Sequence, residues 1–381
     1  MDNTVSTPRG MLSLSKAETS GSLRNCGSDE TGELKVLSVT WNQDCSCFTA
    51  GTNRGFCVYT SKPFKESRRH DLKGCGFKIV EMLFQSHLFA LVGDGSNDTL
   101  YPSNKVWIWD DHQDRCHCEL AFRSEVVSVK LQRDCIVVVL QHKIYVYSFN
   151  DLKVQRQIET IMNPKGLCCI SHHVTANILA CPGLDRGQVQ VHDLGRKTTK
   201  IIDAHDSAVA CMTLTLDGTL LATASTKGTL IRIFNAMDGT RLQELRRGAE
   251  KAAVYSIAIS QNLKWAAASS DRGTVHVFHL NLSIQSLSPT AVQNRNSSDT
   301  TYPSTNPGSS LSFMRGVLPK YFHSERSFAQ FSLPESTKFI AGFGSENTLL
   351  LVGMNGSFLR CRFDPVGGGK MLELEHKRFS S

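Results

Sequence analysis

The sequence has no long hydrophobic run. Its apolar stretches, such as Ile136–Leu140, are far shorter than the roughly 20 residues that a membrane-spanning helix requires. The N-terminus also lacks the apolar core of a secretory signal peptide. We therefore expect any contact with a membrane to be peripheral.

The sequence also lacks the motifs of the common enzyme classes. It contains no Gly-x-Ser-x-Gly elbow, Walker loop, His-Glu-x-x-His motif or dinucleotide fingerprint. Cys116-His117-Cys118 with His112 is the nearest approach to a metal cluster, but a zinc site usually needs a second, separated ligand pair. The alternative is a strand whose side chains alternate between two faces. We expect no catalytic residue, metal or cofactor, and reduced thiols in the cytosol.

Charge of either sign is sparse. Charged residues make up 20% of the chain, and 42 Lys and Arg against 35 Asp and Glu give a net charge of +7. This excess favours acidic partners but lacks the density of a nucleic-acid binder. Residues 1–33 contain few aliphatic side chains and many Ser, Thr, Gly, Asn and Asp, which predicts a disordered tail.

Helical periodicity is nearly absent until late in the chain. Short alternating strands are instead separated by turns rich in Gly, Asp and Asn. Val209–Asn235 overlays Val254–Leu280 at an offset of 45 residues, which places Gly228 on Gly273. Val36–Tyr59 fits the same frame. A period of about 40 to 45 residues with four strands is typical of a β-propeller.

Weaker copies, including segments that end at Trp109, Tyr147 and Phe363, bring the number of repeats to seven. We predict an all-β, seven-bladed β-propeller of WD40-like repeats over residues 34–376, followed by a C-terminal tail at 377–381. The predicted blades are 34–75, 76–122, 123–163, 164–204, 205–247, 248–338 and 339–376.

The sharpest motif is Leu245-Arg246-Arg247-Gly248, at the junction between the fifth and sixth repeats. Successive side chains of an extended segment point to opposite faces, so the two arginines can serve two pockets. Guanidinium groups bind phosphate in a bidentate manner, and we expect both to be exposed. An Arg-Arg pair alone is usually a solvated strand end. The matched hydroxyl-rich turns Ser225–Thr229 and Ser269–Thr274 favour a phosphate site.

With these features the chain resembles the PROPPIN family, the WIPI-like phosphoinositide-binding WD-repeat β-propellers of autophagy. That family carries a Phe/Leu-Arg-Arg-Gly motif between blades five and six, and Leu245 matches one branch of it. The resemblance covers about residues 34–376. It includes, in the expected order, Asn42-Gln43-Asp44, Asn104–Asp110, Ala222–Thr229 and Ser270–Phe278.

The resemblance implies two headgroup sites, for phosphatidylinositol 3-phosphate and phosphatidylinositol 3,5-bisphosphate. By position, the first would use His205, Ser225, Thr226, Lys227, Thr229 and Arg246. The second would use Arg247, Ser269, Ser270, Arg272, Thr274 and His276. Alternatively, His205 is a structural histidine of a blade edge, and the hydroxyls cap local backbone amides. Lys227 and Arg272 are alternatively only solubilising, because Arg54 and Arg186 occupy equivalent turn positions.

A long membrane-facing loop of blade six is predicted over residues 281–327. One helical face within it is apolar and the opposite half is basic, a pattern that suits the surface of an anionic membrane. Pro319 argues against a continuous helix in water, and the alternative is a disordered loop with chance aromatics. The residues expected to insert are Phe313, Met314, Val317, Leu318, Tyr321 and Phe322.

The resemblance implies a peripheral membrane effector that recruits autophagy machinery during autophagosome formation. It names the lipid-transfer protein of autophagy as a partner, and preautophagosomal, endosomal or vacuolar/lysosomal membranes as the location besides the cytoplasm. We expect a monomer in solution that binds no nucleic acid. The alternative is a soluble WD-repeat scaffold whose arginine pair binds acidic or phosphorylated proteins without a lipid role.

Overall fold

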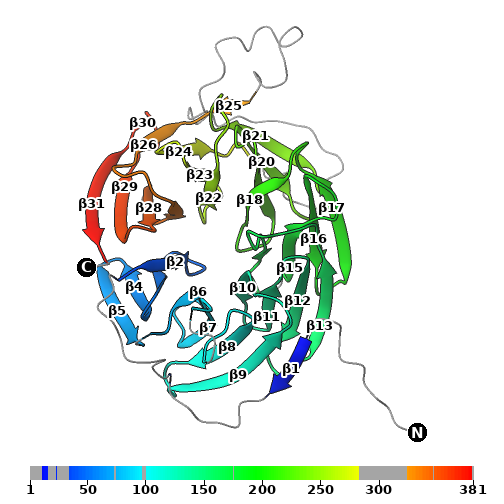
Figure 1. Ribbon diagram of the computed structural model, residues 1–381. Helices are drawn as coiled ribbons and strands as arrows, with labels where there is room; N and C mark the ends of the chain where they lie inside the picture. Colours follow the sequence, from blue (N-terminus) through cyan, green and yellow to red (C-terminus); the bar gives the residue numbers. More distant parts are fainter. Residues whose placement is uncertain are drawn as a thin grey trace. The chain divides into compact units, whose positions relative to one another are not determined.

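The computed structural model is built from β-strands (Figure 1). It describes residues 11–15, 23, 34–72, 74–96, 100–174, 176–282, 324–345 and 347–379. In these ranges no helix occurs, and hence none is long and apolar enough to cross a bilayer. The described strands form seven sheets, each with a core of four antiparallel strands. We call these sheets blades one to seven in chain order.

The first compact unit lies within Met1–Gly166 and holds three blades. Blade one contains β2 (Val36–Trp41), β3 (Cys47–Thr52), β4 (Gly55–Ser61) and β5 (Phe64–Asp71). Blade two contains β6 (Phe77–Met82), β7 (Leu88–Gly93), β8 (Lys105–Asp110), β9 (Arg115–Phe122) and, beside β9, β1 (Met11–Ser15). Blade three contains β10 (Ser128–Leu131), β11 (Cys135–Val139), β12 (Lys143–Ser148) and β13 (Val154–Glu159).

The second unit, Leu167–Phe379, holds the other four blades. Blade four contains β14 (Cys169–Ile170), β15 (Ile178–Pro182), β16 (Gln188–Asp193) and β17 (Thr198–Asp203). Blade five contains β18 (Val209–Leu214), β19 (Leu220–Ser225), β20 (Leu230–Asn235), β21 (Arg241–Arg246) and β25 (Glu325–Arg326). Blade six contains β22 (Val254–Ile259), β23 (Trp265–Ser270), β24 (Thr274–His279), β26 (Ala329–Ser332) and β30 (Gly369–Lys370). Blade seven contains β27 (Phe339–Phe343), β28 (Thr348–Gly353), β29 (Ser357–Arg362) and β31 (Leu372–Arg378).

Burial follows the position of a strand within its blade. The second strands β11 and β19 are buried along their whole length, whereas the outer strands β5, β13, β17 and β31 are largely exposed. Within each unit, every large apolar cluster is shared by two consecutive blades. Four-stranded sheets that stack face to face in chain order are the blades of a propeller. The predicted seven-bladed, all-β fold class is therefore confirmed.

Three short strands differ from the sequence-based boundaries. β1 lies inside the predicted disordered tail and pairs with β9. β25 lies inside the predicted long loop and pairs in parallel with β21 of blade five. β30 lies inside the predicted seventh blade but pairs with β26 of blade six. Each adds to the outer edge of a sheet, where unpaired N–H and C=O groups accept a strand of almost any sequence, so periodicity does not reveal it.

The cysteines also depart from the prediction at one position. Cys75 is disulfide-bonded, and its partner lies outside the described residues, whereas the other described cysteines form no disulfide. The segment around Cys116 forms part of β9. Burial raises the pKa of Cys118 to about 12, so its thiol stays protonated. In the described ranges, no group of three or more His, Cys, Asp or Glu is arranged to hold a metal ion.

Candidate functional site

The Leu245–Gly248 motif lies at the end of β21, where the chain leaves blade five for blade six. Leu245 is fully buried in the apolar cluster that these two blades share. Arg246 is the last residue of the strand and lies opposite Leu230 in β20 and Arg326 in β25. The apolar first residue therefore anchors the strand, and the arginines follow where the strand ends.

Arg247 is buried rather than exposed. Its side chain is 7% exposed, and its Nε donates a hydrogen bond to the Gly228 carbonyl at 2.9 Å. Its Nη2 donates to the Glu250 carbonyl, and its backbone N–H donates to the Thr229 carbonyl at 2.9 Å. The prediction that both arginines are exposed is therefore wrong for Arg247. The chain bends after β21, so the guanidinium reaches carbonyls that would otherwise lack donors.

Arg247 also influences blade six. Burial and, second, the positive charge of Arg247 lower the pKa of His276 to about 4. The Nδ1 of His276 lies 3.2 Å from the Ser327 hydroxyl, on the segment that leads into β26. Arg247 therefore stands between the turn of blade five and the imidazole of blade six.

The residues assigned to the first site gather at the β19–β20 turn and the end of β17. Thr226 and Lys227 are exposed, whereas Ser225 is buried and accepts a hydrogen bond from the Lys227 N–H at 3.4 Å. His205 lies across the blade, with Nε2 3.0 Å from the Thr223 hydroxyl. Burial and then the charge of Arg232 lower the pKa of His205 to about 4. Both histidines are thus neutral at pH 7.

The residues assigned to the second site form the equivalent turn of blade six, between β23 and β24. Ser270 accepts a hydrogen bond from the Arg272 N–H at 3.4 Å, in the same way as Ser225 accepts one from Lys227. Ser269 differs, because its hydroxyl is fully buried and donates to the Phe339 carbonyl at 2.6 Å. The Ser269 hydroxyl therefore joins blades six and seven, and Ser270 is buried as well.

Arg272, like Arg247, is bonded to the segment that connects blades five and six. Its Nε and Nη2 donate to the Lys251 carbonyl at 3.1 and 2.7 Å, and its Nη1 lies 3.3 Å from the Glu250 carboxylate. Arg247 and Arg272 thus donate hydrogen bonds to the carbonyls of two consecutive residues, Glu250 and Lys251, respectively. This role goes beyond the solubilising one that the sequence left open for Arg272.

Two polar residues of the site were missed by sequence reasoning. Arg326 lies beside Arg246 through the β21–β25 pairing, and Ser327 lies beside His276. Both follow the long loop and are far in sequence from the motif. The only sequence signal is the polar run Ser324–Ser327 before β26, and nothing in it specifies the partner strand.

The base of the long loop is closed beside the motif strand. Asn281, which follows β24, lies with its Nδ2 3.3 Å from the Glu325 carboxylate, and Gln243 of β21 donates to the same carboxylate at 2.9 Å. The residues predicted to insert into membranes lie outside the described residues, namely Phe313, Met314, Val317, Leu318, Tyr321 and Phe322.

Comparisons with known proteins agree with this architecture. The model of the PROPPIN family matches residues 35–374. Autophagy-related protein 18e of Arabidopsis thaliana is 59% identical over 100% of this chain and 97% of its own length. Autophagy-related protein 18 of Dictyostelium discoideum is 30% identical over 88% of this chain and 91% of its own length.

Solved structures show the same fold at low sequence identity. Hsv2 of Kluyveromyces lactis matches with a TM-score of 0.70 and 20% identity, over 91% of this chain and 99% of that chain. A complex of KlAtg21 with the coiled-coil of AgAtg16 matches with a TM-score of 0.72 and 22% identity, over 91% and 99% of the two chains. Together with the family match over almost the whole propeller, these findings show that the chain belongs to the PROPPIN family of autophagy-related β-propellers, which are binding proteins and not enzymes.

Proposed function

We propose that the chain binds phosphatidylinositol 3-phosphate and phosphatidylinositol 3,5-bisphosphate at two sites, one on each side of the Leu245–Gly248 motif. The observation that supports this most is the position of Arg247 between two equivalent turns, each with a basic residue and hydroxyl groups. Cations and hydroxyls in this combination recognise the phosphates and the ring of an inositol headgroup.

The first proposed site contains the exposed Thr226 and Lys227 with the half-buried Thr229, Arg246 and His205. The second contains Arg247, Arg272, Thr274 and His276. The buried hydroxyls of Ser225 and Ser270 each accept a hydrogen bond within their turn, whereas the buried Ser269 hydroxyl donates to the Phe339 carbonyl of blade seven. Each headgroup contact is weak alone, but two sites in one compact unit engage the same bilayer, so the second binding event is effectively intramolecular.

The direct test is flotation with liposomes that contain phosphatidylinositol 3-phosphate, the 3,5-bisphosphate, or unphosphorylated phosphatidylinositol with phosphatidylserine at matched charge. We expect flotation only with the two 3-phosphorylated lipids. Equal flotation with phosphatidylserine would contradict headgroup recognition. Binding to a phosphorylated peptide with no flotation would favour the soluble scaffold instead.

We further propose that membrane binding recruits autophagy machinery to preautophagosomal, endosomal or vacuolar/lysosomal membranes. The autophagy names of the curated relatives support this role, and the solved KlAtg21 complex contains a coiled-coil of another autophagy protein. For this chain the proposed partner is the lipid-transfer protein of autophagy. Pulldown of that protein with and without 3-phosphorylated liposomes tests the coupling between the two interactions.

The two neutral histidines predict a loss of stability in acid. Their pKa values fall from 6.5 in the unfolded chain to about 4 in the folded one. Between these values the unfolded state binds more protons, so the free energy of unfolding decreases as the pH falls from about 6.5 to 4. The thermal unfolding midpoint should therefore drop between pH 7 and pH 5. In His205→Gln/His276→Gln this drop should shrink, and an unchanged slope would contradict the assignment.

The long loop yields a prediction about release from membranes. If its apolar face inserts, fluorophores at positions 313 and 322 should report an apolar environment on 3-phosphate liposomes and not on liposomes without that lipid. Phe313→Ser/Val317→Ser/Phe322→Ser should dissociate faster while keeping its lipid selectivity. Val292→Ser, in the same loop but outside this face, serves as the control. Unchanged release by the triple variant would rule out insertion by this face.

A further inference from the structure

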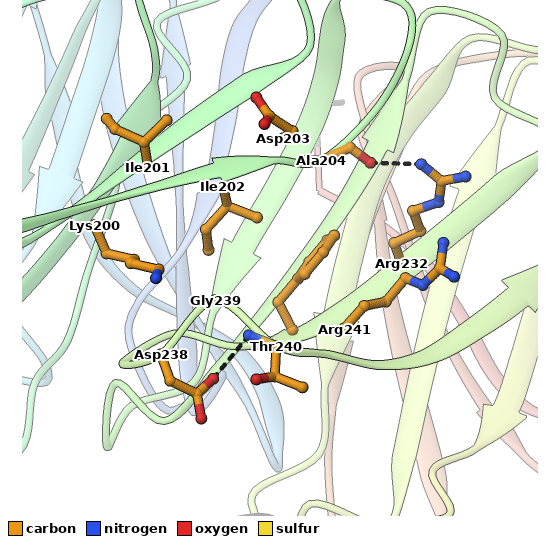
Figure 2. A pocket seen from close by; sticks show the side chains of 11 residues that line it. Lys200, Ile201, Ile202, Asp203, Ala204, Arg232, Asp238, Gly239, Thr240 and Arg241 are labelled. Atoms are coloured by element: carbon orange, nitrogen blue, oxygen red, sulfur yellow. Dashed lines mark hydrogen bonds between the residues drawn. The ribbon is translucent and has the colours of Figure 1, made fainter.

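A cavity of 470 Å³ lies between blades four and five (Figure 2). One wall is the outer strand β17 with Ala204, and the other is formed by Arg232, Phe234 and the turn Asp238–Arg241. Arg241 and Arg246 are the first and last residues of β21, so their Cα atoms are roughly 17 Å apart at the usual rise of an extended strand. The end of the cavity at Arg241 is therefore distinct from the proposed headgroup sites, whereas the end at Ala204 and Arg232 adjoins His205 of the first site.

Two contacts between the blades hold the cavity open. At one end, Arg232 Nη1 donates a hydrogen bond to the Ala204 carbonyl at 2.7 Å. At the other, the turn of blade five packs on β17 so closely that a Cβ on Gly239 would lie 2.9 Å from Cε of Lys200. Ile202 and Phe234 between these ends are 4% and 3% exposed. The cavity is thus bounded at both ends by contacts between the two blades, and the residues between these ends, Ile202 and Phe234, are buried and apolar.

Among the residues that the structure describes, the three basic residues that line the cavity, Lys200, Arg232 and Arg241, have a single carboxylate partner between them. Lys200 forms no ion pair with any residue in the described part of the chain. The carboxylate of Glu244 serves both Arg232, at 2.8 Å, and Arg241, at 3.4 Å. The Arg241 side chain remains 54% exposed. Lys200 and Arg241 can therefore each pair with an additional carboxylate.

The two acidic residues of the lining do not supply that carboxylate. Asp203 accepts a hydrogen bond from Gln188 Nε2 at 3.0 Å, and Asp238 accepts one from the Thr240 N–H at 2.7 Å. Each of these carboxylates therefore bonds to a group of its own blade. A ligand that complements Lys200 and Arg241 would therefore carry negative charge.

The backbone of β17 offers a second mode of recognition. β17 is the outermost strand of blade four, and no described strand pairs with its outer edge. The corresponding edges of β9, β21 and β26 each carry an added strand of this same chain, namely β1, β25 and β30. Blades of this protein therefore accept strand addition, and the edge of β17 is open to a strand from another chain.

We propose that β17 and the adjoining cavity bind an extended segment of a partner protein by strand addition. Lys200 and Ile202 point toward the turn of blade five, and Ile201, which also lines the cavity, points to the other side of β17 and is 48% exposed (Figure 2). The side chains of an added strand fall on the same two faces. The segment therefore alternates acidic residues, which reach Lys200 and Arg241, with apolar residues that cover Ile201. This interaction is independent of lipid binding.

The test uses a fluorescein-labelled, N-acetylated Val-Glu-Val-Glu-Val-Glu-Val amide with the full-length chain. We expect micromolar affinity by fluorescence anisotropy. A peptide with Lys in place of Glu lacks charge complementarity, and one with Pro in place of the central Val lacks a ladder donor, so neither should bind. Lys200→Glu/Arg241→Glu should weaken binding at least about tenfold, because it places two acidic side chains against the peptide.

The matched control is Lys65→Glu in β5, another exposed lysine on an outer strand without an added strand. It should bind the peptide as the unaltered chain does. Liposome flotation by Lys200→Glu/Arg241→Glu should be unchanged, which shows that the variant is folded and separates this proposal from the lipid-binding one. No binding of the acidic peptide, equal binding of the Lys or Pro peptide, or no effect of the double substitution would each overturn the proposal.

Discussion

Arg246→Thr/Arg247→Thr should abolish flotation with liposomes that contain phosphatidylinositol 3-phosphate. Each replacement removes the guanidinium of one proposed site, so neither headgroup is held. The single variants should retain weak binding, because the other site is intact and only the gain from two-site attachment is lost. Arg196→Thr, which removes an arginine with a 75% exposed side chain on the turn before β17, should bind normally.

The two arginines should differ in their effect on stability. Arg247→Thr removes the hydrogen bonds to the Gly228 and Glu250 carbonyls and leaves these acceptors without that donor. Hydrogen bonds from a charged group contribute about 1.5 to 3 kcal/mol each, so the thermal midpoint should fall. Arg246→Thr should change it much less. Full flotation by the folded double variant would refute the site assignment, and an unchanged midpoint in Arg247→Thr would refute the structural role.

Gly228→Ala should be the most destabilising of three glycine replacements around the site. Gly228 has a φ of +62°, and a Cβ there would lie 1.9 Å from the Ala252 carbonyl oxygen. An L-residue in this conformation costs about 1 to 2 kcal/mol, and displacing a backbone carbonyl costs about as much again. We therefore expect a loss of about 3 kcal/mol in the free energy of unfolding, together with weaker flotation, since Arg247 is bonded to the Gly228 carbonyl.

Replacement of two neighbouring glycines separates the cost of the positive φ from the cost of the close contact with a carbonyl. Gly273, at the equivalent turn of blade six, has a φ of +65° but open space at its Cβ position, so Gly273→Ala should cost only about 1 kcal/mol. Gly248 has no atom within 4 Å of that position and is not in the left-handed region, so Gly248→Ala should be within about 0.5 kcal/mol of neutral. The fall in thermal midpoint should be largest for Gly228→Ala, smaller for Gly273→Ala and smallest for Gly248→Ala. Any other order would contradict the close approach at Gly228.

The fold was predictable because the same pattern of strand and turn residues repeats along the chain. The offset of 45 residues that places Gly228 on Gly273 also places Ser225 on Ser270, and both serines accept a hydrogen bond from the basic residue of their turn. The motif was predictable because it falls between two such turns. Local patterns of this kind survive in the sequence, because each turn must satisfy the same backbone geometry.

Features that depend on distant segments were not predictable. The burial of Arg247 results from a bend that brings it to the Gly228 carbonyl, and the role of Ser269 results from its contact with Phe339 in the next blade. The strand at Glu325–Arg326 joins blade five although its neighbours in sequence belong to blade six. A single sequence carries no record of which edge or carbonyl a polar side chain will meet.

The pairing of β25 with β21 has a mechanical consequence. Between β24 and β26 the chain passes through β25, whose residues Glu325 and Arg326 lie in register with Leu245 and Arg246 of β21. Tension on the loop along the strand direction would load this pairing in shear, and the load would pass directly into β21, which ends at Arg246 and is followed at once by Arg247. An anchor formed by the loop would thus pull on the strand that leads into the proposed headgroup sites and not on a remote part of the propeller.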